Sequence, residues 1–263
     1  MTTAIAHASE ARSSRSGNGS LLIALPEPTV SMRQDAEWCV VRDNGHWRQI
    51  RFHDYHELYA IPGLYERIFY EILRCDSPQV VCSLLQHELA EAGVAADELR
   101  VLDLGAGNGM VGEQLAEHGA EFIVGTDIIE EAGLAAERDR PGVYDDYHVV
   151  DMTDLDARTR KELADCRFNT LTCVAALGFG DIPTAAFTAA YNLIRPGGWI
   201  AFNIKEKFLN GRDSSGFAEL IRSITDAGAL QIRRKKRYCH RLGTDRQPLH
   251  YVGVVGRKLH DIS

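Results

Sequence analysis

The sequence predicts a doubly wound α/β domain with a mostly parallel sheet, preceded by a smaller N-terminal module. Three observations point to this fold class. From Arg100 onward, short apolar runs alternate with helix-length stretches, and a glycine-rich turn follows the first of these runs. The 263 residues are enough for one large domain and a small extra module. Strands that alternate with helices imply a parallel sheet, because parallel strands need a crossover connection.

The chain begins with a predicted disordered lead over residues 1–30, whose serines and glycines offer little to bury. Residues 31–95 are expected to form a hairpin and a helical cover. Within them, residues 37–42 and 47–52 have the composition of strands, and the turn residues at 43–46 join them into a hairpin.

Two helices are predicted next, the first over residues 64–73 and the second from Ser77 to about Gly93. Ser77 is the expected cap and Pro78 the first helical residue. The α/β domain is predicted over residues 96–263. Its expected strands lie at 100–104, 121–126, 145–150, 168–175, 198–204, 229–241 and 248–258, and its expected helices at 109–118, 129–138, 157–165, 182–194 and 214–227.

Composition excludes several classes of protein. Hydrophobic residues at 45% and charged residues at 25% are typical of a packed globular core. A net charge of −8 disfavours nucleic acid and anionic membranes as partners. No apolar stretch approaches the roughly 20 residues of a membrane span, and no signal peptide is apparent. The six cysteines have no C-x-x-C pair, so we expect reduced thiols, no metal site and a cytoplasmic protein.

The glycine-rich turn is the first candidate binding element. Gly105, Gly107 and Gly109 lie between a predicted strand and a helix start, where glycines allow a tight turn and close approach of a ligand. Such a turn also suits the pyrophosphate of a dinucleotide. Asp103, two residues before the first glycine, is poorly suited to pyrophosphate but can organise a loop around a cationic amino-acid end.

Two further carboxylates end the next strands. Asp127 lies about 20 residues after the turn, a spacing at which an acid accepts hydrogen bonds from ribose hydroxyls. Asp151, followed by Met152, ends the third strand, where an acid could accept from an adenine amino group. The structural alternatives are that Asp127 caps the following helix and that Asp151 caps the turn at 153–156.

Together these motifs resemble those of the class I S-adenosylmethionine-dependent methyltransferase family. The resemblance covers residues 100–258 and includes the run from Leu193 to Ile200, a helix end, turn and fifth strand typical of that family. It implies a seven-stranded sheet with an antiparallel last strand, which residues 248–258 suit. Asn169 departs from the family, which more often has an acidic residue at that point.

The resemblance implies S-adenosylmethionine as the cofactor and assigns roles to the motif residues. The three glycines would line the methionine moiety and Asp103 would support its amino end. Asp127 would bind the ribose, Asp151 would contact the adenine amino group, and the backbone of Met152 would lie alongside the ring.

The acceptor site is predicted from two segments, residues 53–70 and the loop at 175–181. Tyr55, Tyr59 and Phe179 are the candidate substrate-binding residues, with core packing as the alternative for the aromatic residues of 53–70. Methyl transfer needs mainly alignment, so the catalytic residue is left open, with His53 and His56 as candidate bases. Asp181 is expected to cap the helix that begins near Ile182.

The sequence favours a methyltransferase that acts on an oxygen or nitrogen atom of a small molecule. One alternative is a protein or RNA methyltransferase that uses the basic run 233–237, although that run can equally form a solvated strand face. A non-catalytic S-adenosylmethionine-binding module and a nicotinamide-dependent oxidoreductase are further alternatives. The oligomeric state is left open.

Overall fold

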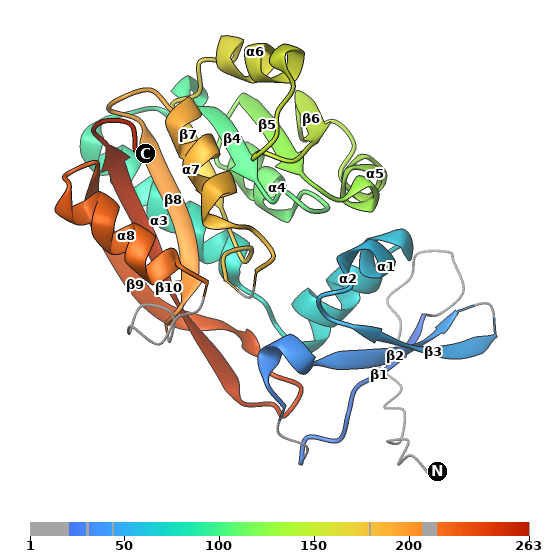
Figure 1. The fold of residues 1–263 in the computed structure, drawn as a ribbon. Helices are drawn as coiled ribbons and strands as arrows, with labels where there is room; N and C mark the ends of the chain where they lie inside the picture. Colours follow the sequence, from blue (N-terminus) through green and yellow to red (C-terminus); the bar gives the residue numbers. More distant parts are fainter. Residues whose placement is uncertain (1–20, 30–31, 44, 179, 207–214, 263) are drawn as a thin grey trace.

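Two β-sheets organise the part of the chain that the computed structural model describes, residues 21–29, 32–43, 45–178, 180–206 and 215–262 (Figure 1). The larger sheet contains seven strands: β4 (Arg100–Leu104), β5 (Phe122–Asp127), β6 (Asp146–Val149), β7 (Thr170–Cys173), β8 (Trp199–Lys205), β9 (Leu230–Leu242) and β10 (Pro248–Lys258). Their spatial order is β6-β5-β4-β7-β8-β10-β9. Each of the seven predicted strands is confirmed to within a few residues.

Strand directions agree with the predicted fold class. Strands β4 to β8 pair in parallel, whereas β10 lies antiparallel between β8 and β9. The central strands are buried on both faces, as in β8, where every residue from Trp199 to Ile204 is buried. Continuous apolar strands are typical of sheets covered by helices on both sides.

Helices cover both faces of this sheet: α3 (Ser77–Ala92), α4 (Met110–Glu117), α5 (Glu130–Asp139), α6 (Ala157–Asp165), α7 (Thr184–Leu193) and α8 (Phe217–Asp226). One apolar cluster joins α6, α7 and α8 to the sheet, and a second joins α3 and α4 to it. Helix α5 packs beside β5 and β6. The sequence predicted all six of these helices, and the fold class is confirmed.

The N-terminal module contains a three-stranded antiparallel sheet in the order β1-β2-β3 and a helical layer. Its elements are β1 (Leu22–Ala24), a short 3₁₀ helix η1 (Gln34–Ala36), β2 (Trp38–Asp43), β3 (His46–Arg51), α1 (Tyr55–Ala60), α2 (Leu64–Glu66) and a π-helical segment η2 (Arg67–Ile72). A second 3₁₀ helix, η3 (Ala96–Glu98), precedes β4.

Two expectations for this module need correction, and one is confirmed. The disordered lead over residues 1–30 is wrong for Leu22–Ala24, which pair with β2; residues 1–20 and 30 lie outside the described chain. The predicted hairpin is confirmed, although Asn44 of its turn is not among the described residues. Helix α1 was not predicted, and the helix expected over 64–73 consists of α2 and η2.

Ser77 does not cap α3 as predicted. The N-cap residue is Asp76, and Ser77 is already helical. Its hydroxyl instead lies 2.7 Å from the hydroxyl of Tyr238 and 2.6 Å from Nδ1 of His240, and accepts from the Asn203 side chain at 3.0 Å. This buried network joins α3 to strands β8 and β9.

The β9–β10 hairpin clamps the N-terminal module to the large sheet (Figure 1). The backbone N–H of Leu242 donates to the carbonyl of Leu73 at 2.7 Å. Arg241 donates to the carboxylate of Glu37 at 2.6 Å, and the two side chains are only 4% and 3% exposed. Thr244 donates its backbone N–H to the same carboxylate. The first and last parts of the chain therefore pack together.

The cysteines and the lengths of the helices were both the subject of predictions from composition. All six cysteines are free thiols, and Cys39, Cys82 and Cys173 are buried. Within the described residues, each helix is too short or too polar to cross a membrane.

Candidate active site

A cavity of about 290 Å³ lies at the carboxyl ends of strands β4, β5, β6 and β7. Ligands bind at this edge of open α/β sheets. Four of the residues predicted to bind cofactor line it, namely Gly105, Asp127, Asp151 and Met152. The opposite wall comes from the N-terminal module and the α7 region: His53, Tyr55, Tyr59, Tyr65, Asp181, Ile182, Pro183 and Ala186. The sheet and the N-terminal module thus enclose one space.

The glycine turn after β4 has the backbone conformation that glycine permits. Gly105, Gly107 and Gly109 have φ values of +70°, +55° and +90°, which side-chain-bearing residues rarely adopt. A Cβ atom on Gly107 would lie 2.5 Å from the hydroxyl of Tyr59, so the N-terminal module packs directly on this turn. Gly105 lines the cavity, whereas Gly107 and Gly109 are not among its lining residues.

Asp103 lies behind the glycine turn and is 1% exposed. Its two carboxylate oxygens accept from the Thr172 hydroxyl at 2.7 Å and the Tyr144 hydroxyl at 2.9 Å. Burial raises the pKa of Asp103 to about 7. Asp103 is not among the residues that line the cavity, so the predicted support of a ligand by this carboxylate is not a direct contact.

Asp127, at the end of β5, holds the glycine turn and lines the cavity. One oxygen accepts from the backbone N–H of Gly107 at 3.0 Å and the other from that of Ile129 at 3.1 Å. Burial raises the pKa of Asp127 above its usual range. Each carboxylate oxygen has two lone pairs, so both oxygens can accept a further hydrogen bond from a ligand.

Asp151 and Met152 follow β6. Asp151 is exposed, and one of its oxygens accepts from the backbone N–H of Thr153 at 2.8 Å and from its hydroxyl at 2.7 Å. These hydrogen bonds lower the pKa of Asp151. Asp151 therefore caps the local turn and also faces the cavity, and Met152, 5% exposed, packs beside it.

Aromatic rings form the wall that the N-terminal module contributes. Tyr55 and Tyr59 are stacked with centroids 6.2 Å apart, and Tyr59 lies 4.7 Å from Tyr65. Tyr55 and Tyr59 line the cavity, where the sequence predicted substrate contacts. Phe179, the third predicted substrate residue, lies outside the described residues.

The two candidate histidines differ in position. His56 is exposed and is not among the residues that line the cavity. His53 lines the cavity, and its Nδ1 lies 3.0 Å from Oδ1 of Asp181. The expectation that Asp181 caps a helix is wrong, because α7 begins at Thr184 with Pro183 at the N-cap position. Sequence reasoning missed the pairing, since 128 residues separate the partners.

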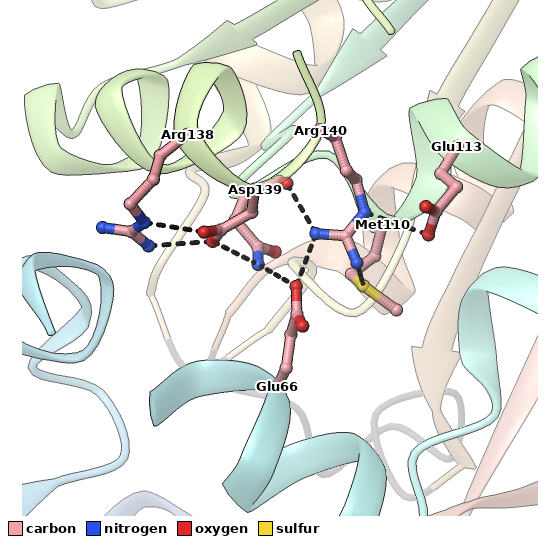
Figure 2. A network of polar contacts seen from close by, with 7 residues as sticks. Glu66, Met110, Glu113, Arg138, Asp139 and Arg140 are labelled. Atoms are coloured by element: carbon pink, nitrogen blue, oxygen red, sulfur yellow. Dashed lines mark hydrogen bonds and ion pairs between the residues drawn. The ribbon is translucent and has the colours of Figure 1, made fainter. Parts of the chain in front are cut away.

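A polar network joins the cover to the glycine turn (Figure 2). Glu66 of α2 accepts from Arg140 at 2.6 Å and from the side chain of Asn108, within the turn, at 3.1 Å. Arg140 also donates to the carbonyl of Asn108 and to Glu113. Arg138 donates to the carbonyl of Tyr59 at 3.1 Å, so α5 holds α1 as well.

The basic run lies on the edge strand β9, and three of its arginines face carboxylates. Arg233 and Arg234 pair with Glu88, and Arg237 pairs with Glu206 at 2.9 Å. This arrangement agrees with a solvated strand face. Among the described residues, no group of three or more His, Cys, Asp or Glu side chains could hold a metal ion.

Comparisons with known proteins agree with the fold and with a methyltransferase domain. A family model described as a methyltransferase domain matches residues 102–200. A ubiquinone biosynthesis O-methyltransferase from Burkholderia ambifaria is 29% identical over 170 residues, which are 62% of this chain and 69% of that protein. A protein of the same description from Xanthomonas euvesicatoria is 35% identical over 101 residues, 38% and 40% of the two chains.

A solved structure shares the fold. The N-methyltransferase NodS from Bradyrhizobium japonicum, crystallised with S-adenosylhomocysteine, superposes with a TM-score of 0.52 at 14% identity and covers 79% of this chain and 97% of its own. The sheet order and the cavity at its carboxyl edge define a methyltransferase-type α/β fold. The chain is a methyltransferase whose matched domain spans residues 102–200.

Proposed function

We propose that this enzyme methylates an oxygen or nitrogen atom of a small molecule held between the sheet edge and the N-terminal module. The observation that carries the proposal is the shared cavity, in which aromatic side chains of the module face the strand ends. A space of about 290 Å³ with mostly apolar walls and a few polar groups is typical of small-molecule sites.

The residues around the cavity fit S-adenosylmethionine, which supplies a methyl group on a positively charged sulfur. A Cβ atom on Gly105 would lie 2.8 Å from Ile182, so the backbone there is open only because the residue is glycine. We assign the ribose hydroxyls to Asp127, the adenine to Asp151 and Met152, and the methionine part to the glycine turn that Asp103 supports.

The aromatic wall suits the positive charge of the donor. Tyr59 and Tyr65 of the N-terminal module line the cavity, and aromatic rings attract cations. We further propose that residues 31–95 act as a cover for the domain at 96–263. Alignment of the reacting atoms in such an enclosed space can contribute roughly 7–11 kcal/mol to the rate.

The Burkholderia relative is by description an O-methyltransferase of ubiquinone biosynthesis, and this supports a small-molecule acceptor. A protein or RNA acceptor has less support, because three arginines of the basic run already pair with carboxylates of this chain.

The proposal is tested by incubating the enzyme with radiolabelled S-adenosylmethionine and a cell extract. The extract is then separated into an ultrafiltrate of small metabolites, a protein fraction and an RNA fraction. We expect label in the ultrafiltrate, and much less label there with Asp127→Ala at a concentration of S-adenosylmethionine below saturation. Label confined to protein or RNA would contradict a small-molecule acceptor, and cofactor binding without label in any fraction would indicate a non-catalytic module.

A further inference from the structure

We propose that His53 accepts the proton of an acceptor hydroxyl and that Asp181 positions the imidazole for this step. The inference rests on the proposed function and narrows it, because it assigns to the acceptor an ionisable hydroxyl group.

The first support is the pairing of His53 and Asp181 across the cavity. His53 lies in the loop between β3 and α1, and Asp181 in the loop between β7 and α7. Nδ1 of the imidazole is 3.0 Å from Oδ1 of the carboxylate, and the side chains are 21% and 24% exposed. A carboxylate at this distance favours the tautomer in which Nδ1–H donates, so Nε2 carries the lone pair that can take a proton.

The second support is the position of this pair along the sheet edge. In the order β6-β5-β4-β7, the residues assigned to adenine and ribose follow β6 and β5. The reactive end of the donor therefore belongs near β4 and β7, and Asp181 follows β7. His53 and Asp181 line this cavity together with Gly105 and Ala176. A second cavity of about 40 Å³ shares His53 and Asp181, so the pair stands where the two spaces meet.

The chemistry explains why a hydroxyl acceptor needs this pair. A neutral hydroxyl is a weak nucleophile, whereas a neutral amine attacks through its own lone pair. In the proposed step the hydroxyl proton moves to Nε2 of His53, and an oxygen electron pair forms the bond to the methyl carbon. The bond from that carbon to sulfur breaks, and its electron pair stays on sulfur. The imidazolium then releases its proton to water. Such general base catalysis contributes about 10²–10⁴-fold.

The carboxylate of Asp181 contacts the imidazole directly, and further ionisable groups lie nearby. Asp35 of η1 interacts electrostatically with His53. The other ionisable groups that line the smaller cavity with His53 and Asp181 are Tyr55 from α1, Tyr65 from α2, Cys75 before α3, and His240, Arg241 and Tyr251 from the β9–β10 hairpin. Asp35 pairs with Arg33, and Arg241 pairs with Glu37. Burial lowers the pKa of His240 well below its usual value, so that ring is neutral.

The experiment uses 4-nitrophenol, whose phenol and phenolate forms absorb at different wavelengths. The full-length enzyme is saturated with S-adenosylhomocysteine, so that no transfer occurs, and the probe is added at a pH below its own pKa in water. We expect the spectrum of the bound probe to show the phenolate band in the wild type. His53→Gln should bind the probe without that band, and Asp181→Asn should weaken the band while probe affinity is kept.

His56→Gln is the matched control, because this neighbouring histidine is exposed and is not among the cavity-lining residues. It should behave as the wild type. A bound probe that stays protonated in the wild type, or a phenolate band that survives in His53→Gln, would overturn the proposal. Failure of the probe to bind would also overturn it, while retained S-adenosylhomocysteine binding would leave the proposed function standing. Loss of S-adenosylhomocysteine binding in the wild type would instead contradict the proposed function.

Discussion

The carboxylate of Asp127 has two roles, and substitutions of this residue test its role in cofactor binding. It accepts hydrogen bonds from the backbone N–H groups of Gly107 in the glycine turn and of Ile129 after β5, and, in our assignment, from the ribose hydroxyls. Asp127→Ala removes a charged acceptor, worth about 1.5–3 kcal/mol. We therefore expect S-adenosylhomocysteine to bind about 10- to 150-fold more weakly. Isothermal calorimetry measures this, and Asp127→Asn, which keeps one oxygen, should lose less. Unchanged affinity in a folded Asp127→Ala variant would refute the ribose assignment.

Asp103 makes the stability of the enzyme depend on pH. Burial raises its pKa from 3.8 to about 7, so the folded state holds a proton there that the unfolded state releases. The unfolding free energy should therefore fall by about 1.4 kcal/mol for each pH unit between these two values. Asp103→Asn removes this contribution while retaining an oxygen for the Thr172 hydroxyl.

Denaturant unfolding of wild type and Asp103→Asn at several pH values checks this expectation. The variant should gain stability relative to the wild type as the pH rises from 5 to 7. A stability difference that stays constant over this range would show that Asp103 is ionised in the folded enzyme throughout.

At the scale of elements, the network in Figure 2 holds the cover on the glycine turn. Glu66→Gln removes the negative charge of the carboxylate to which Arg140 and Asn108 both donate. We expect the free energy of local opening of α1, α2 and η2 to fall by about 1–2 kcal/mol. Amide exchange in these elements should then become about 5- to 30-fold faster. Hydrogen exchange followed by mass spectrometry over residues 53–72 measures this.

Glu71→Gln is the control for this experiment. Glu71 lies on the same segment and pairs with Arg67, but it is 56% exposed. Exposed pairs contribute little to stability, so exchange should stay within about twofold of the wild type. Adding S-adenosylhomocysteine should protect residues 53–70 in the wild type. If only the glycine turn becomes protected, residues 53–70 do not cover the ligand.

The elements that sequence predicted well are those with strong local signals. The alternation of apolar runs with helix-length stretches predicted β4 to β10. The spacing of Gly105, Gly107 and Gly109 predicted the turn after β4, where all three have positive φ. Helix α1 was missed because six residues between a strand and Pro62 carry too little periodicity. The His53–Asp181 pair was missed because no local pattern connects residues in two distant loops. The sequence could indicate His53 as a candidate base, but only the folded structure shows that Asp181 is its partner.

Across the whole molecule, the buried pair of Glu37 and Arg241 fastens the N-terminal module to the hairpin. Arg241→Met leaves the Glu37 carboxylate buried without its charge partner, and this should cost about 3–5 kcal/mol. Limited proteolysis should then cut the chain between the module and α3. The double variant Glu37→Gln/Arg241→Met should recover most of the loss, because the amide oxygen still accepts from Thr244. If the single variant is as resistant as the wild type, the pair is not a clamp.

The same ion pair between Glu37 and Arg241 limits the order in which parts of the nascent chain can complete their packing. Glu37 and Arg241 are 204 residues apart, so the first strands leave the ribosome long before their partner exists. At that stage β2 and β3 can pair, but the hairpin that completes their packing has not been made. Contacts of such long sequence separation also slow refolding, because the chain must close a long loop before they can form. The wall that places His53 in the cavity is therefore secured last, after the cofactor turn has already formed.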